Sequence, residues 1–256
     1  MTKHIRILLL PLILLSGVNA RAYSVMSLPG SLFSLSSEPK KGLAGKSELG
    51  LSFLQGNINT NQTLLAQEVS YRWTDETLQL LAEYFEQSAA GILKGQRWRG
   101  SLRYERRVVF RLGAFAGETL EGNPFLGYQQ RYSTDLGARY HLWKDDKTRG
   151  AMEAGYRYQI ENRTNGIQSD HSVGRLFFEF SYTWDENANA LFGIEYLPVL
   201  SNPADWRMNA ELGLNLRLTS ILALKITNGY RYANIPSGTA VTRLDRQVLT
   251  SLLASF

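Results

Sequence analysis

The stretch WRMNAELGLNLRL, residues 206–218, alternates apolar and polar side chains at every second position. The residues between its apolar positions are polar or glycine. The apolar set is Trp206, Met208, Ala210, Leu212, Leu214, Leu216 and Leu218. Successive side chains of a β-strand point to opposite faces, whereas a helix would space its apolar residues three and four apart. We therefore predict a β-strand with one apolar and one polar face.

The same alternation recurs along most of the chain and predicts about twelve strands. They are expected near residues 46–55, 63–73, 77–86, 96–105, 108–117, 128–142, 148–160, 171–184, 188–197, 206–218, 222–232 and 242–256. Short connections, such as Arg106–Arg107, alternate with long ones, such as Gln87–Gly95. Short turns at one end and long loops at the other are typical of bacterial outer-membrane barrels. We predict an all-β fold, a single antiparallel up-and-down transmembrane β-barrel over residues 46–256.

The N-terminus has the features of an export signal over residues 1–22. Lys3 and Arg6 make a positive region, an apolar run spans Ile7–Leu15, and Ala20–Ala22 fits a signal-peptidase site. The apolar run is shorter than the ~20 residues that a membrane-spanning helix needs. We predict that the mature protein begins at Tyr23 and is inserted in the bacterial outer membrane.

Residues 23–45 show no strand pattern and contain several Pro, Gly and Ser residues. One interpretation is a disordered periplasmic leader. The alternative is a short plug or docking peptide anchored by Leu32, Phe33 and Leu35.

Composition excludes several classes of protein. The net charge of +5 falls to +2 when Lys3, Arg6 and Arg21 leave with the signal, and no basic stripe indicates nucleic-acid binding. The chain has no Cys, so disulfides and thiolate metal sites are excluded. Rows of leucine on the apolar faces argue against a secreted soluble β-protein, because so large an exposed apolar band would aggregate in water.

Aromatic residues mark the expected membrane boundaries and the C-terminus. Tryptophan is enriched at membrane interfaces, where its ring is buried and its N–H stays near water. All five tryptophans fall near strand ends on the apolar face and are assigned to an interface girdle: Trp73, Trp98, Trp143, Trp184 and Trp206. The terminal Phe256 resembles the assembly signal of outer-membrane barrels. The expected partners are therefore outer-membrane lipid and, during insertion, the barrel-assembly machinery.

The polar faces carry many charges of both signs. The residues assigned to the lumen lining are Arg103, Arg111, Arg139, Arg157, Arg175, Arg207, Arg217, Arg231, Glu153, Glu179, Glu195 and Glu211. The same faces also hold Glu48, Glu83, Arg99, Glu105, Arg131, Asp135 and Lys225. Mixed charge can line a conducting pore, where it sets selectivity, or form a closed ladder of arginine–carboxylate pairs. An open pore is expected to favour anions weakly.

Enzymatic motifs are weak, and we expect no catalytic residues, cofactor or metal site. The histidines are His4 in the signal, His141 near a short turn and His171 beside a long loop, so the latter two are expected at opposite barrel ends. No HExxH, Walker A or GxSxG motif occurs.

From Lys46 onward the chain resembles the YdiY-like outer-membrane barrels of unknown function, long labelled salt-induced outer membrane proteins. The resemblance is carried by Glu48–Ser52, which leads into Gly56–Thr60, by the hairpin series, and by the terminal strand ending in Phe256. It covers residues 46–256 and implies an outer-membrane barrel without catalytic residues. We expect a small channel or passive pore; the alternative is a non-conducting structural barrel that contacts an unknown protein partner through its long loops or leader.

Overall fold

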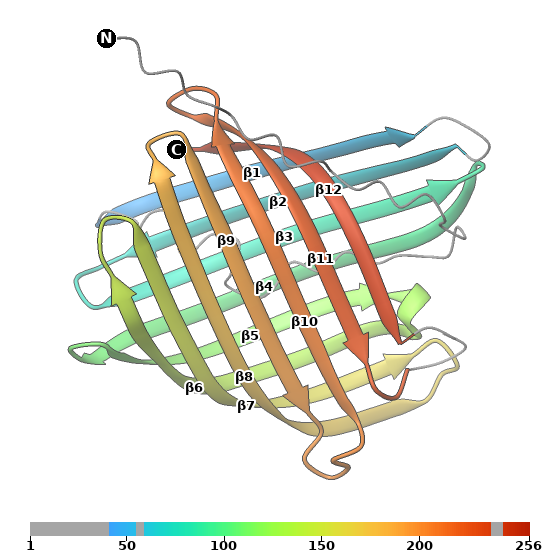
Figure 1. Ribbon diagram of the computed structural model, residues 1–256. Coiled ribbons are helices and arrows are strands. Elements are labelled where there is room, and N and C mark those ends of the chain that lie inside the picture. Colours follow the sequence, from blue (N-terminus) through green and yellow to red (C-terminus); the bar gives the residue numbers. More distant parts are fainter. Residues whose placement is uncertain (1–40, 55–58, 237–242) are drawn as a thin grey trace.

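The computed structural model describes residues 41–54, 59–236 and 243–256. These form a closed barrel in which each strand pairs antiparallel with its sequence neighbours and β12 returns to β1 (Figure 1). The predicted fold class and the count of twelve strands are confirmed. The strands are β1 (Gly42–Leu54), β2 (Thr60–Arg72), β3 (Glu76–Ala89), β4 (Ile92–Val109), β5 (Leu112–Asn123), β6 (Tyr128–Lys144), β7 (Thr148–Arg163), β8 (Gln168–Asp185), β9 (Ala188–Pro198), β10 (Trp206–Arg217), β11 (Leu222–Ala233) and β12 (Leu244–Ser255).

The two ends of the barrel differ in their connections. We call the turn end the one that carries the start of β1, the C-terminus and the connections after β2, β4, β6, β8 and β10. The loop end carries the connections after the odd-numbered strands, including a short 3-10 helix, η1 (Pro124–Leu126). β1 begins at Gly42 rather than Lys46, and the predicted signal peptide and residues 23–40 lie outside the described residues.

Two expected connections were misplaced. The long loop predicted over Gln87–Gly95 is instead a tight turn of Ala90 and Gly91, because pairing of β3 with β4 continues across a bulge as far as Ile92. Ala90 and Gly91 have φ of 52° and 75°, the left-handed conformation that a two-residue hairpin turn requires.

The turn predicted at Arg106–Arg107 lies further on, at Phe110 and Arg111. Arg106 and Arg107 extend β4 beyond the expected end, and each reaches a carboxylate of the neighbouring hairpin: Arg106 Nε lies 3.7 Å from Glu76 and Arg107 Nη1 3.9 Å from Asp75. The run of arginines and valines has no alternation, so the strand end could not be located from pattern alone.

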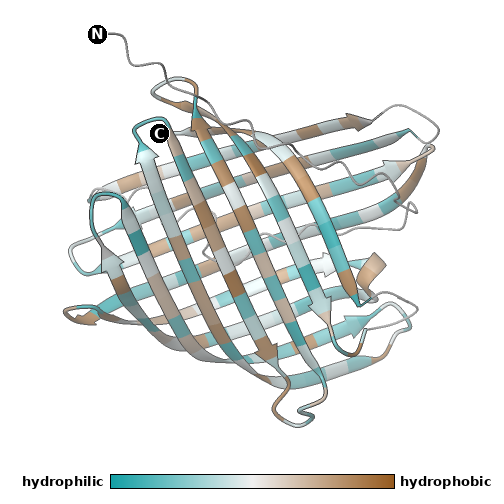
Figure 2. Cartoon of the chain, in the orientation of Figure 1, coloured by the Kyte–Doolittle hydropathy of each residue, from teal (hydrophilic) through white to brown (hydrophobic). Residues whose placement is uncertain are grey.

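The strands are banded by hydropathy because one face meets the lumen and the other the exterior (Figure 2). From β3 onward odd-numbered residues face the lumen, whereas in β1 and β2 even-numbered residues do; the exceptions Tyr128 and Trp143 lie at bulges near the two ends of β6. Outward leucines such as Leu49, Leu136 and Leu212 are exposed and form the apolar surface. Among the described residues no helix is long and apolar enough to cross a membrane.

The tryptophans lie on the outer surface, and Trp73, Trp143, Trp184 and Trp206 contact other aromatic rings. Trp73 packs edge-on to Tyr71 and Trp184 to Tyr182, both toward the turn end, while Trp206 stacks on Tyr232 at 4.9 Å toward the loop end. Trp98 and Trp143 lie over Gly122 and Gly150, where any Cβ would meet the indole ring. Strict alternation would turn Trp143 inward, but a bulge between His141 and Trp143 shifts it to the outer face.

Candidate functional site: the charged lumen

The register of the strands between β4 and β10 brings opposite charges together inside the barrel. Arg139 of β6 lies opposite Glu153 of β7, and Asp135 lies opposite Arg157. Lumen positions recur at every second residue of each strand, so a lumen side chain has neighbours on both adjacent strands. Each charged residue can therefore contact a partner on either side, and the ion pairs form a continuous network. We call this set the charge ladder: Arg103, Asp135, Arg139, Glu153, Arg157, Arg175, Glu179 and Glu195.

Glu153 is the centre of the ladder. It accepts from Arg103 Nη2 at 2.7 Å and Arg175 Nη1 at 2.5 Å, and it is also bonded to Arg139, which in turn reaches Glu179. One carboxylate is therefore shared by three guanidinium groups, an arrangement that suits arginine because its planar fork can bond two carboxylates at once.

The ladder continues toward the loop end through Glu195. Arg175 Nε donates to Glu195 at 2.8 Å, and Asn209 Nδ2 donates to the other carboxylate oxygen at 3.0 Å. Arg157 binds Asp135 in bidentate fashion at 2.7 and 2.9 Å and lies 3.5 Å from Glu195. The ladder thus joins strands β4 and β6–β9 across one side of the lumen, and Asn209 links it to β10.

Aromatic rings fill the space beside the arginines. The guanidinium of Arg103 lies 4.0 Å from the ring centre of Phe115, and that of Arg175 lies 5.5 Å from Phe115 and 5.3 Å from Phe177. A cation over a ring face is attracted by the ring quadrupole, and the ring also excludes water. Phe115 packs so closely that a Cβ on Gly137 would lie 2.7 Å from the ring.

The middle of the lumen is closed by these side chains. Glu179 and Glu195 are fully buried and Arg175 is 1% exposed, so no lumen water reaches them. On the opposite side of the lumen Leu64, Phe85 and Leu249 form a buried apolar cluster. Burying so many charges is tolerated only because each is paired and hydrogen-bonded. The barrel is therefore constricted by side chains at mid-height.

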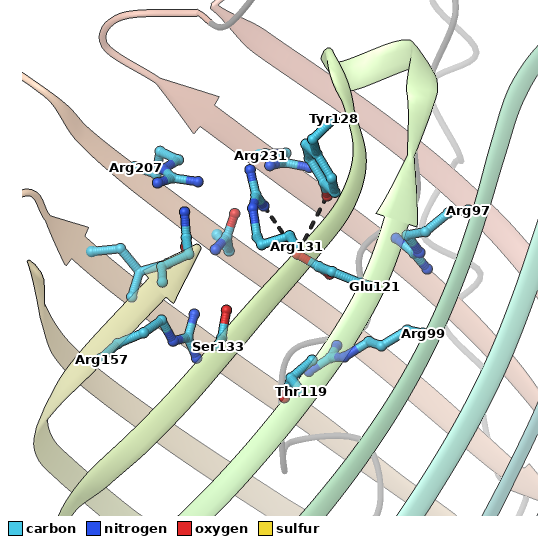
Figure 3. Close-up of a pocket in the computed structure, with 13 residues that line it drawn as sticks. Arg97, Arg99, Thr119, Glu121, Tyr128, Arg131, Ser133, Arg157, Arg207 and Arg231 are labelled. Atoms are coloured by element: carbon cyan, nitrogen blue, oxygen red, sulfur yellow. Dashed lines mark hydrogen bonds and ion pairs between the residues drawn. The ribbon is translucent and has the colours of Figure 1, made fainter. Parts of the chain in front are cut away.

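Beyond the ladder, toward the loop end, lies a partly enclosed cavity of about 30 Å³ that we call the arginine pocket (Figure 3). Six arginines contribute to its wall, whereas Glu121 is the one carboxylate there among the described residues. The arginines are Arg97, Arg99, Arg131, Arg157, Arg207 and Arg231. The side chains come from β4, β6, β7, β10 and β11 and converge on the same space.

The carboxylates near the pocket are shared among several arginines. Glu161 lies 2.7 Å from Arg131, 3.6 Å from Arg207 and 3.8 Å from Arg163. Arg131 also donates to Glu121 at 3.0 Å, and its guanidinium stacks on Tyr128 at 3.7 Å. The wall of this cavity is consequently more positive than the ladder below it.

The structure places the predicted lumen residues in the charge ladder, in the arginine pocket, elsewhere on the lumen face, and at exposed positions near strand ends. The ladder holds Arg103, Arg139, Arg157, Arg175, Glu153, Glu179 and Glu195, and Arg207 and Arg231 lie in the wall of the arginine pocket, to which Arg157 also contributes. Glu211 is buried on the lumen face of β10. Arg111 instead lies in the exposed turn after β4, where it donates to the carbonyl of Leu142, and Arg217 is exposed at the end of β10.

Sequence reasoning missed Arg97, Glu121, Tyr128 and Glu161. Glu121 and Glu161 fall in segments predicted to be loops, but they continue the lumen face of β5 and β7. Strands that rise above the lipid no longer need apolar outward residues, so alternation fades there. The charged residues in these segments stay at odd-numbered positions, like the lumen residues before them. This regularity is the signal that could have predicted the longer strands.

A family model described as "Protein of unknown function, DUF481" matches residues 47–256. The chain belongs to this family. The match confirms the resemblance to the YdiY-like barrels over the part of the chain that forms the barrel. None of the curated proteins matches this sequence.

Solved structures share the fold at low sequence identity. An outer-membrane channel from Pseudomonas putida F1 is 12% identical with a TM-score of 0.56, covering 91% of this chain and 100% of that one. The NanC porin is 11% identical with a TM-score of 0.51, covering 83% and 98%. The translocator domain of the autotransporter NalP from Neisseria meningitidis is 12% identical with a TM-score of 0.50, covering 86% and 89%. The protein is an integral barrel of the bacterial outer membrane, with the fold of porins and channels.

Proposed function

We propose that this barrel is a narrow channel for small anions, in which the arginine pocket selects the solute and the charge ladder restricts its passage. The observation that carries the proposal is the arginine pocket, where six arginines and one carboxylate contribute to the wall of a single cavity. A charged ring at a constriction sets selectivity through its field, which is strong where low-dielectric walls focus it.

The charge ladder supports a restricted rather than an open pore. Its side chains are buried at mid-height, so solutes larger than small ions would have to displace several ion pairs to pass. No catalytic step is part of the proposal. His141 lies toward the turn end beside Glu105 and His171 toward the loop end, so the two described histidines do not converge on a common site.

The test is the reversal potential of the purified protein in a planar bilayer under a KCl gradient. The proposal predicts a reversal potential whose sign shows that chloride permeates more readily than potassium. Arg207→Gln should reduce this preference, whereas Arg217→Gln should leave it unchanged, since Arg207 lines the arginine pocket and Arg217 is exposed at the other end of β10. A potassium preference in the unmodified protein would overturn the proposal.

The second candidate is a non-conducting barrel that binds a partner. It is favoured by the complete burial of Glu179 and Glu195, which leaves no water path on the ladder side. This candidate predicts no conductance for the unmodified protein or for a variant in which the ladder is loosened.

A further inference from the structure

The seam between β1 and β12 is only half closed. The two strands pair over Lys46–Gly50 and Ser251–Ser255. Beyond that point, although residues 51–54 and 244–250 are all described, the two strands are not paired with each other. Each pairs with its other neighbour along nearly its full length. The unpaired half is at the loop end, where β1 and β12 diverge (Figure 1).

The turn-end half of the seam is held by backbone hydrogen bonds and by side chains on the lumen face. The backbones of Gly45 and Phe256 exchange two hydrogen bonds of 3.0 Å. Inside the lumen, Glu48 of β1 accepts from Lys225 Nζ at 3.0 Å and from Ser251 Oγ at 2.5 Å. β1 and β12 are therefore paired with each other at the turn end of the seam and not at its loop end.

The free half lies at the level of the apolar surface. Outward side chains on either side of it, Leu51, Phe53 and Val248, are large, apolar and exposed. Strand edges facing hydrocarbon leave N–H and C=O groups without water to bond, and such groups demand another partner. A molecule that offers both polar and apolar groups suits this position.

The lumen side of the free half is unusual for a barrel interior. Leu249 on β12 packs with Leu64 and Phe85 in the buried apolar cluster, although barrel interiors are ordinarily polar. Next to it, the amide of Gln247 is buried and neither its oxygen nor its nitrogen has a hydrogen-bond partner. A buried apolar cluster and an unsatisfied amide therefore lie together on the lumen side of the seam.

The outer side of the free half carries a positive charge on the lipid face. Arg246 donates to Asn228 Oδ1 at 3.2 Å, and its guanidinium lies 5.4 Å from the ring centre of Tyr230. Asn228 in turn donates to the Tyr230 hydroxyl at 3.0 Å. An arginine on the lipid face lowers stability most near the bilayer midplane. Here the aliphatic part of the Arg246 side chain and the Tyr230 ring stabilise the guanidinium beside the open seam.

We propose that the free half of this seam is a lateral binding site for a single-chain anionic amphiphile. Its chain enters the seam between Leu51, Phe53 and Val248 and reaches Leu249, its anionic head is held by Arg246, and it exchanges between lumen and membrane through the seam. The site does not require conduction through the charge ladder, so it stands apart from the proposed channel function.

The open seam is tested by disulfide formation between introduced cysteines, since the sequence has no native Cys that could form a competing disulfide. The double variant Leu49→Cys with Leu252→Cys joins two outward residues that are paired. The double variant Phe53→Cys with Val248→Cys joins two outward residues that would be paired if the seam were complete. A disulfide needs Cα atoms within roughly 7 Å. The first pair should cross-link under mild oxidation and the second should not; equal cross-linking would overturn the open seam.

The occupant is tested by fluorescence quenching in detergent. A bimane label is placed through Ser52→Cys, on the lumen face of the free half, and through Asn189→Cys, on the lumen face of β9 as control. The probe is 5-doxyl-stearate, compared with its neutral methyl ester. Saturable quenching by the acid at position 52 alone, lost on Leu249→Gln, is expected. Absence of saturable quenching, or equal quenching by the ester, would overturn the proposal; heat-modifiable gel migration confirms that each variant is folded.

Discussion

The two sides of this barrel are closed by different means. On the ladder side, β6, β7 and β8 pair over long registers, and buried arginine–carboxylate contacts join them inside the lumen. On the seam side, β1 and β12 share a short register fastened by Glu48 at one end. The barrel wall is therefore not uniform: buried ion pairs join the strands of one sector, whereas β1 and β12 pair with each other over only five residues of each strand.

The largest expected effect is on the ladder. Glu153→Gln should lower the free energy of unfolding by about 3–5 kcal/mol, because it removes the buried charge that three lumen arginines share. Glu48→Gln, on the seam side, should cost less, because Glu48 holds one lysine and one hydroxyl. Urea titration of heat-modifiable gel migration measures both. An equal or greater loss for Glu48→Gln would break the comparison.

The second prediction tests the lipid face of the fully paired wall. Leu212→Arg, near the middle of β10, should cost roughly 2–4 kcal/mol, and Leu218→Arg, just past its end, about 0–1 kcal/mol. Both leucines are exposed and receive the same side chain, so propensity largely cancels. Folding into liposomes followed by urea titration gives the values; similar losses at the two sites would mean that the assumed depth is wrong.

A third prediction compares packing in the two sectors. A Cβ on Gly137 would meet backbone atoms of Ala154 and Gly155 within 2.9 Å, whereas a Cβ on Gly50 would meet the side chains of Leu64 and Leu249 at 3.1–3.4 Å. Gly137→Ala should therefore cost about 1–3 kcal/mol, as overpacking does. Gly50→Ala should cost less, because leucine side chains can move. The order of the two urea midpoints decides the point.

The smallest expected effect lies in the turn after β6, outside both sectors. Hydrogen bonds from the Thr148 hydroxyl and from the amides of Thr148 and Lys147 hold the pKa of Asp145 below its ordinary value. A lowered folded-state pKa contributes stability above the unfolded value, and this is lost as pH falls through the folded value. Asp145→Asn should flatten the acid limb of stability slightly. A steeper acid limb would contradict this assignment.

The barrel could be predicted because the lipid imposes strict alternation wherever a strand crosses it. The lumen phase of the central strands followed directly, and Arg139, Glu153 and Arg175 were assigned from it. Strand ends above the lipid were not predicted from apolar alternation, because nothing forces Glu121 or Glu161 to alternate with apolar neighbours; only the odd-numbered positions of the charged residues marked them. Bulges such as the one before Trp143 were equally hidden, since they shift the phase without changing composition.

The arginine pocket and the open seam depend on register, which a single sequence does not encode at the level of individual residues. Arg246, an exposed residue on the outer face of β12, is an example. From Leu244 to Thr250, β12 pairs with β11 but not with β1, so Arg246 lies beside the open part of the seam. Pairing between the first and last strands is the longest-range contact in the chain and the least accessible to pattern analysis.

The most direct test of the account is the single-channel conductance of Phe115→Ala beside that of the unmodified protein. Phe115 is buried against Arg103 and Arg175, and its removal opens the constriction without leaving a charge unpaired. If the charge ladder restricts a channel, Phe115→Ala should conduct more than the unmodified protein and keep its preference for chloride. A conductance that is unchanged by Phe115→Ala would contradict the account.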